Sequence, residues 1–80
     1  MKLDIDHLLK ESKLSLIQTK DDKWFLRLKT IMNGNQLEER FLLEDILNYR
    51  QLDSEEKIKY HDFVKHYLGL QLLRKLNEKG

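Results

Sequence analysis

The chain has 80 residues, of which 40% are hydrophobic and 36% are charged, and it contains no cysteine and no proline. Without cysteine it can form no disulfide framework, no zinc–thiolate centre and no thiol nucleophile. This length predicts a single domain over residues 1–80, with too small a core to support a deep active site. The net charge of +1 is below the basic excess that is typical of dedicated nucleic-acid-binding proteins.

No stretch of the sequence suits a membrane or a secretion signal. The longest apolar runs, such as residues 41–43, have three residues, whereas a membrane span needs about 20. Charged and apolar residues alternate at the N-terminus, unlike a signal peptide. We therefore expect a cytoplasmic protein without membrane contact, and the lack of alanine and proline suggests a bacterial or phage origin.

The first predicted element is a short helix over residues 4–11. Ile5, Leu8 and Leu9 have the i, i+3, i+4 spacing of one helical face. Asp4 precedes them and can accept backbone N–H bonds as the N-cap. Because two turns are marginally stable alone, this helix must pack on the rest of the chain.

A β-hairpin is predicted to follow this helix. Residues 14–17 have a strand-like pattern, residues 20–23 form a polar cluster, and a second strand covers residues 24–32. Side chains alternate between the two faces of a strand. The expected core face of the second strand carries Trp24, Leu26, Leu28, Thr30 and Met32.

Asn33-Gly34 predicts a tight turn and a third strand, because both central residues of a type I′ turn need positive φ. A two-residue loop opposes Met32 to Asn35 and ends the third strand near Leu42. One pair in this register is unfavourable, since Arg27 faces Arg40. The other expected pairs are Leu26 with Phe41, Trp24 with Leu43, Lys29 with Glu38, and Phe25 with Leu42.

An alternative interpretation places a helix over residues 36–43. Asn35 and Glu38 have the spacing of a capping box, which would begin a helix at Gln36. Against it, the apolar residues between 37 and 47 spread around the helical wheel instead of forming one stripe. We favour the strand, followed by a short helix over residues 44–51.

The last predicted element is a long helix from residue 54 to about residue 78. Asp53 and Glu56 have the capping-box spacing at its start. Gly69, in its middle, indicates a kink, a break or a close crossing. Its expected buried stripe consists of Tyr60, Val64, Tyr67, Leu68, Leu72 and Leu76. The predicted architecture is thus α+β: a short helix, a three-stranded antiparallel meander, then a short and a long helix on one sheet face.

The sequence favours neither metal binding nor catalysis. His61, Asp62 and His66 are close in sequence, but the two histidines are five residues apart and diverge on a helix. Ser12, Ser15 and Ser54 are not in a glycine-flanked nucleophile turn, and three scattered glycines make no phosphate-binding loop. We therefore expect no metal, no cofactor and no enzymatic activity.

The apolar surface of the long helix exceeds what one sheet face requires. Tyrosine and tryptophan, which the chain contains, are enriched at interface centres. We expect a protein-interaction module, a small regulator or inhibitor, that presents a helical surface to a larger protein or to its own copy. The competing interpretation is a kink at Gly69 that turns these side chains into one core. The candidate interface residues are Tyr60, Phe63, Tyr67, Leu70 and Leu73.

The alternative function is nucleic-acid binding by the outer face of the sheet. An aromatic side chain among cations can stack on bases and contact phosphates. Glu38 dilutes the positive charge of this face, which makes the hypothesis the weaker of the two. Its candidate residues are Phe25, Arg27, Lys29 and Arg40.

Overall fold

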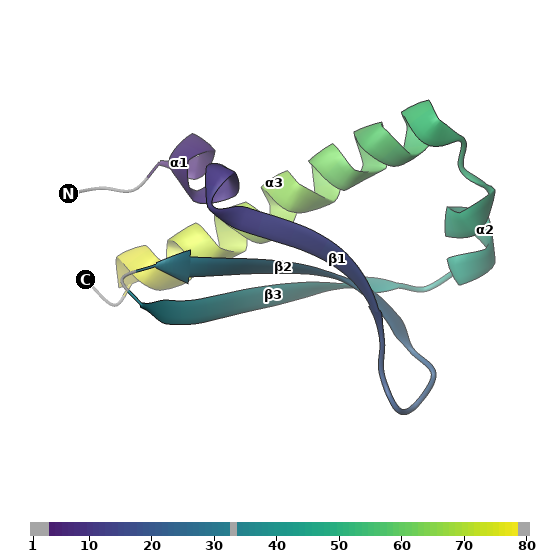
Figure 1. The fold of residues 1–80 in the computed structure, drawn as a ribbon, viewed down its shortest axis with the longest axis horizontal. Coiled ribbons are helices and arrows are strands. Elements are labelled where there is room, and N and C mark those ends of the chain that lie inside the picture. Colours follow the sequence, from purple (N-terminus) through teal and green to yellow (C-terminus); the bar gives the residue numbers. More distant parts are fainter. Residues whose placement is uncertain (1–3, 33, 79–80) are drawn as a thin grey trace.

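Three strands form one antiparallel sheet in the order β1-β2-β3, with helices before and after it (Figure 1). The computed structural model describes residues 4–32 and 34–78. The architecture is the predicted α+β fold. Its elements are α1 (Ile5–Lys10), β1 (Ser12–Gln18), β2 (Trp24–Met32), β3 (Asn35–Leu43), α2 (Ile46–Gln51) and α3 (Ser54–Glu78).

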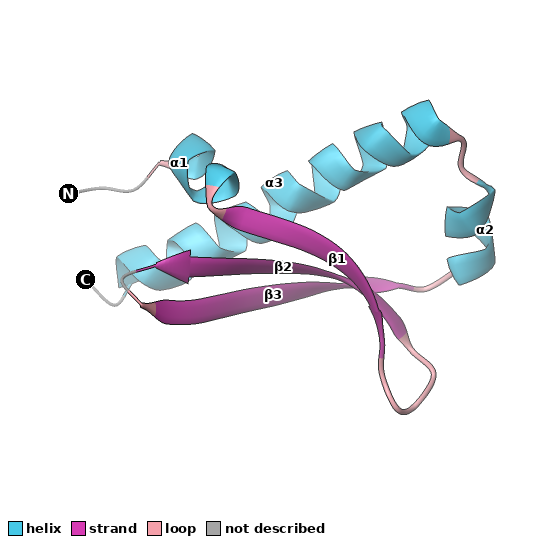
Figure 2. Ribbon diagram, in the orientation of Figure 1, coloured by secondary structure: helices cyan, strands magenta, loops and turns pink. Residues whose placement is uncertain are grey.

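Helix α3 crosses one face of the sheet, and α1 lies beside it (Figure 2). The short helix α2 lies beyond the end of β3, where the chain turns back to begin α3 (Figure 1). Ile46 and Tyr49 of α2 pack against the core. Within the described residues, the opposite face of the sheet is left without a covering helix.

The third strand is confirmed, and its register is the predicted one. Met32 opposes Asn35, and every other expected pair is present, including Arg27 opposite Arg40. Gly34 has a φ of 78°, which suits a glycine in a tight turn. Asn33, the other central residue of the predicted turn, lies outside the described residues.

The core lies between the sheet and the two helices α1 and α3. On β2, Leu26, Leu28 and Thr30 are buried, as their alternation predicts. The Thr30 hydroxyl donates a hydrogen bond to the carbonyl oxygen of Glu11 at 3.2 Å, so this polar side chain is satisfied inside the core. The buried hydrophobic residues are Leu8, Leu26, Leu28, Leu43, Val64, Leu68 and Leu72.

Carboxylate side chains begin all three helices, as helix capping requires. Asp4 accepts a bond from the His7 N–H at 2.8 Å. The predicted capping box of α3 is present: Asp53 accepts from the Glu56 N–H at 2.8 Å, and Glu56 accepts from the Asp53 N–H at 3.2 Å. Helix α2 begins at Ile46, two residues later than predicted, because Asp45 is its N-cap.

Gly69 marks a close helix crossing, not a break. Helix α3 continues without interruption through this position, where a Cβ atom would lie 2.8 Å from Ile5 Cδ1 and 2.9 Å from Leu9 Cδ2. The missing side chain therefore lets α1 dock directly on the backbone of α3. Because Phe63 and Leu70 remain exposed, the apolar side chains of α3 do not all enter one core.

Candidate protein interface

Helix α3 carries an exposed apolar stripe on the side that faces away from the sheet. Phe63 is 60% exposed, Tyr67 46% and Leu70 50%. Their i, i+4, i+7 spacing places them on one face of the helix. We call Phe63, Tyr67 and Leu70 the outward stripe.

Aromatic contacts hold the outward stripe in place. The rings of Phe63 and Tyr67 stack with their centroids 6.4 Å apart and an interplanar angle of 18°. Tyr67 also meets the ring of Phe41 on β3 edge-on, at 5.8 Å between centroids. Edge-to-face and offset-stacked pairs are the favoured arrangements of aromatic rings. The stripe is thus a preformed surface fixed to the edge of the sheet.

Two of the predicted interface residues lie more deeply than the outward stripe. Tyr60 is half-buried, with its ring 6.3 Å from Phe41 and 5.8 Å from Tyr49 between centroids. Burial, and secondarily the nearby Tyr49, raises the pKa of the Tyr60 hydroxyl above its ordinary value. Leu73 is half-buried and packs against the core. The outward stripe therefore contains three of the five predicted interface residues and includes neither Tyr60 nor Leu73.

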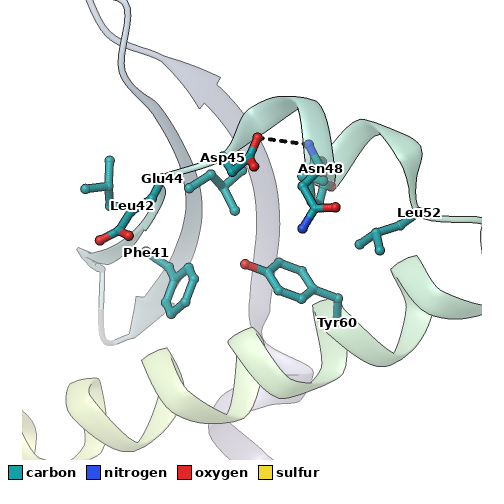
Figure 3. A pocket seen from close by; sticks show the side chains of 9 residues that line it. Phe41, Leu42, Glu44, Asp45, Asn48, Leu52 and Tyr60 are labelled. Atoms are coloured by element: carbon teal, nitrogen blue, oxygen red, sulfur yellow. Dashed lines mark hydrogen bonds between the residues drawn. The ribbon is translucent and has the colours of Figure 1, made fainter.

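A cavity of about 480 Å³ lies between the end of β3, α2 and the first half of α3 (Figure 3). Phe41 and Tyr60 point into it, whereas Leu42 points away. Asp45, on its rim, accepts the Asn48 N–H at 3.1 Å, so this carboxylate caps α2. The cavity is lined by the aromatic rings of Phe41, Tyr49 and Tyr60, with the carboxylates of Glu44 and Asp45 beside them.

A second hollow, of about 440 Å³, separates β1 from the first half of α3. Leu16 of β1 and Ile58 of α3 line it, and both side chains remain exposed. At its end the Tyr49 hydroxyl and His61 Nε2 share a hydrogen bond of 2.6 Å, and burial raises the pKa of Tyr49. Sequence patterns did not reveal this pair, because its residues belong to different helices.

Metal-ligating side chains do not gather anywhere in the described part of the chain. Among residues 4–32 and 34–78, the structure has no group of three His, Asp or Glu side chains that could hold an ion. His61, the first residue of the His61, Asp62 and His66 cluster, is hydrogen-bonded to Tyr49.

The outer face of the sheet brings the four predicted nucleic-acid-binding residues together. Arg27 and Arg40 oppose each other across the β2–β3 pair, and Glu38 Oε2 lies 3.9 Å from Arg27 Nε and 3.6 Å from Arg40 Nε. The Arg40 guanidinium also lies 6.0 Å from the ring centroid of Phe25. One carboxylate thus compensates two guanidinium groups.

This face is more basic than the chain as a whole. Lys13 of β1 opposes Lys29 of β2, and Arg40 lies on β3. Cationic side chains are thus present on all three strands of this face. In the described residues, the outward-facing positions of the sheet hold four cationic side chains and one carboxylate: Lys13, Arg27, Lys29, Arg40 and Glu38.

Within residues 4–32 and 34–78, no helix combines the length and the apolar character that crossing a bilayer requires. Comparisons of the chain with protein-family models, with curated proteins and with solved structures find no match.

Proposed function

We propose that this protein is a non-enzymatic interaction module that binds a protein surface through the outward stripe of α3. The observation that carries the proposal is the exposure of Phe63, Tyr67 and Leu70 together on a helix whose opposite side buries Val64, Leu68 and Leu72. Removing such apolar surface from water is the main favourable contribution to most protein–protein associations. Aromatic side chains are also the residue types that dominate binding at interface centres.

The preformed geometry of the stripe supports a regulatory or inhibitory role. Because Tyr67 is held by both Phe63 and Phe41, binding would order few side chains that are mobile in the free protein. A rigid surface of this kind loses little conformational entropy on association. The module would act by occupying a partner's surface, in the cytoplasm, where a cysteine-free fold needs no oxidising environment.

A paired substitution tests the proposal. Phe63→Asp places a charge in the stripe, whereas Ile58→Asp changes an equally exposed residue of the same helix outside it, at 62% exposure against 60%. Affinity capture and cross-linking with the native chain should yield a bound protein, a second copy included. Binding should be lost with Phe63→Asp and kept with Ile58→Asp. Equal binding by both variants would contradict the proposal.

A second candidate function is binding of nucleic acid by the outer sheet face. The observation in its favour is that four cationic side chains and one carboxylate share a sheet face with Phe25, whose ring lies near the Arg40 guanidinium. Phosphate contacts dominate nucleic-acid affinity. Electrophoretic titration at low salt with single- and double-stranded DNA and RNA tests it. Reversing Arg27 and Lys29 to glutamate should abolish a shift that Phe63→Asp leaves intact. If micromolar protein shifts none of the probes, this function is excluded.

A further inference from the structure

Two exposed charges lie in line with the outward stripe of α3. Glu56 lies seven residues before Phe63, and Arg74 lies seven residues after Tyr67; both are exposed. Seven residues are about 20° short of two helical turns, so all four side chains share one side of the helix. The helix therefore presents, in order, an acid, two aromatic rings and a base, arranged symmetrically about position 65.

We infer that a second copy of this chain covers the stripe, through antiparallel pairing of α3 with the partner's α3 about position 65. This inference rests on the proposed function and names its partner. In this register Glu56 meets the partner's Arg74, and Phe63 meets the partner's Tyr67. Two-fold symmetry repeats each contact once, as in most homodimers.

Charge decides the direction of the pair. Parallel helices would place Glu56 beside the partner's Glu56 and Arg74 beside the partner's Arg74, which repel. Antiparallel helices place opposite charges together at both ends and also oppose the two helix dipoles. Arg74 is available for this contact, because it forms no ion pair within the described residues.

The residues beside the outward stripe are also compatible with antiparallel pairing about position 65. Lys59 lies level with the partner's Leu70 and the partner's Gln71, so its aliphatic stem can cover an exposed leucine without meeting a like charge. Lys75, by contrast, is already bonded to Glu39 on β3 and takes no part. The self-complementary pattern is thus confined to the side of α3 that the sheet leaves free.

The dimer has an apolar centre and charged ends, and these contribute differently. Exposed ion pairs stabilise an association by about 1 kcal/mol or less, so the stripe supplies the affinity and the charges fix direction and register. A contact limited to one face of one helix is at the small end of specific interfaces. We expect reversible dimers at micromolar to millimolar protein concentration.

Sedimentation equilibrium of the full chain over this concentration range tests the association. The native chain should fit a monomer–dimer equilibrium, Phe63→Asp should remain monomeric, and Ile58→Asp should dimerise like the native chain. A native chain that stays monomeric at millimolar concentration overturns the inference. So does a dimer that Phe63→Asp leaves intact.

A charge swap tests the antiparallel register. Glu56→Arg and Arg74→Glu should each weaken dimerisation on the order of tenfold, because each replaces two attractive pairs with two repulsive ones. The double variant Glu56→Arg, Arg74→Glu should recover most of the loss. Circular dichroism checks that helix content is kept, since Glu56 also caps α3. Failure of the double variant to recover overturns this register.

Cross-linking provides a readout that does not depend on Glu56 capping. The chain has no cysteine, so Glu56→Cys and Arg74→Cys each introduce a single thiol. Equal positions lie about 27 Å apart in the antiparallel pair, at 1.5 Å per residue, whereas positions 56 and 74 are adjacent. Mild oxidation should cross-link the mixture of both variants and neither variant alone. Cross-linking of either variant alone as fast as the mixture overturns the antiparallel arrangement.

Failure of the dimer and failure of the proposed function give different experimental outcomes. If the chain is monomeric but captures a different protein in a manner that Phe63→Asp abolishes, the second copy is the wrong partner and the interaction module stands. If the chain neither dimerises nor captures any protein through Phe63, both are overturned.

Discussion

The inward and outward sides of α3 are both apolar, yet they are built differently. The inward side consists of aliphatic residues and a glycine, with Val64, Leu68, Gly69 and Leu72 buried against the sheet and α1. The outward side is led by the aromatic residues Phe63 and Tyr67, which remain about half exposed. The same helix thus has one side that completes the fold and another that is free to bind.

The inward side of α3 contributes to the stability of the fold, whereas the outward side is available for association with a partner. Buried aliphatic side chains pack as densely as molecules in an organic crystal, so the loss of a single methyl group lowers the stability of the fold. Aromatic rings on the surface keep their shape without neighbours, because they have only two rotatable bonds and stack on each other. Substitutions on the two sides should therefore affect different measurements.

The largest expected effect is that of Leu68→Ala on the inward side. Leu68 is fully buried, and truncating a buried leucine to alanine costs about 2–5 kcal/mol of unfolding free energy because it leaves a cavity. Urea denaturation monitored by circular dichroism measures the loss. Leu70→Ala, on the outward side of the same helix, is the matched control and should cost much less. Similar losses for both variants would contradict the two-sided description of α3.

An intermediate effect is expected where α1 meets α3. Gly69→Leu would place a side chain against Ile5 and Leu9, where even a Cβ atom would lie 2.8 and 2.9 Å from their terminal carbons. Overpacking of this kind costs about 1–3 kcal/mol, despite the better helix propensity of leucine. Hydrogen exchange should show faster exchange in α1 while β2 stays protected. Unchanged stability with α1 still protected would mean that the crossing is not tightly packed.

The smallest effect on stability is expected for Phe63→Asp. Because its side chain is 60% exposed, the change in unfolding free energy should be about 0.5 kcal/mol or less. The measurement is urea denaturation at low micromolar concentration, where association does not contribute. A loss as large as that of Leu68→Ala would place Phe63 in the core and remove the basis for a binding surface.

Local patterns predicted most of the fold. Asn33-Gly34 and the alternation along residues 24–32 specify the whole β2–β3 register, including the like-charged pair of Arg27 and Arg40. Asp53 and Glu56 predicted the start of α3 to the residue. These features could be predicted because each depends on residues that are close together in the sequence.

Contacts between distant segments could not be predicted in the same way. The role of Gly69 depends on Ile5 and Leu9, which lie 64 and 60 residues earlier in the chain. The hydrogen bond of Tyr49 with His61 also joins two elements. The helical wheel placed Tyr67 in the buried stripe, yet it meets the sheet only at the edge of Phe41 and stays partly exposed.

The docking of α1 at Gly69 has a consequence for how the chain acquires its structure during synthesis. A helix of six residues does not persist alone in water, and its docking site at Gly69 of α3 is translated 60 residues after Leu9. Leu8, which is fully buried, must wait without its native neighbours until Leu68 and Leu72 have been made. The first helix to be made is therefore among the last of these elements to become stable.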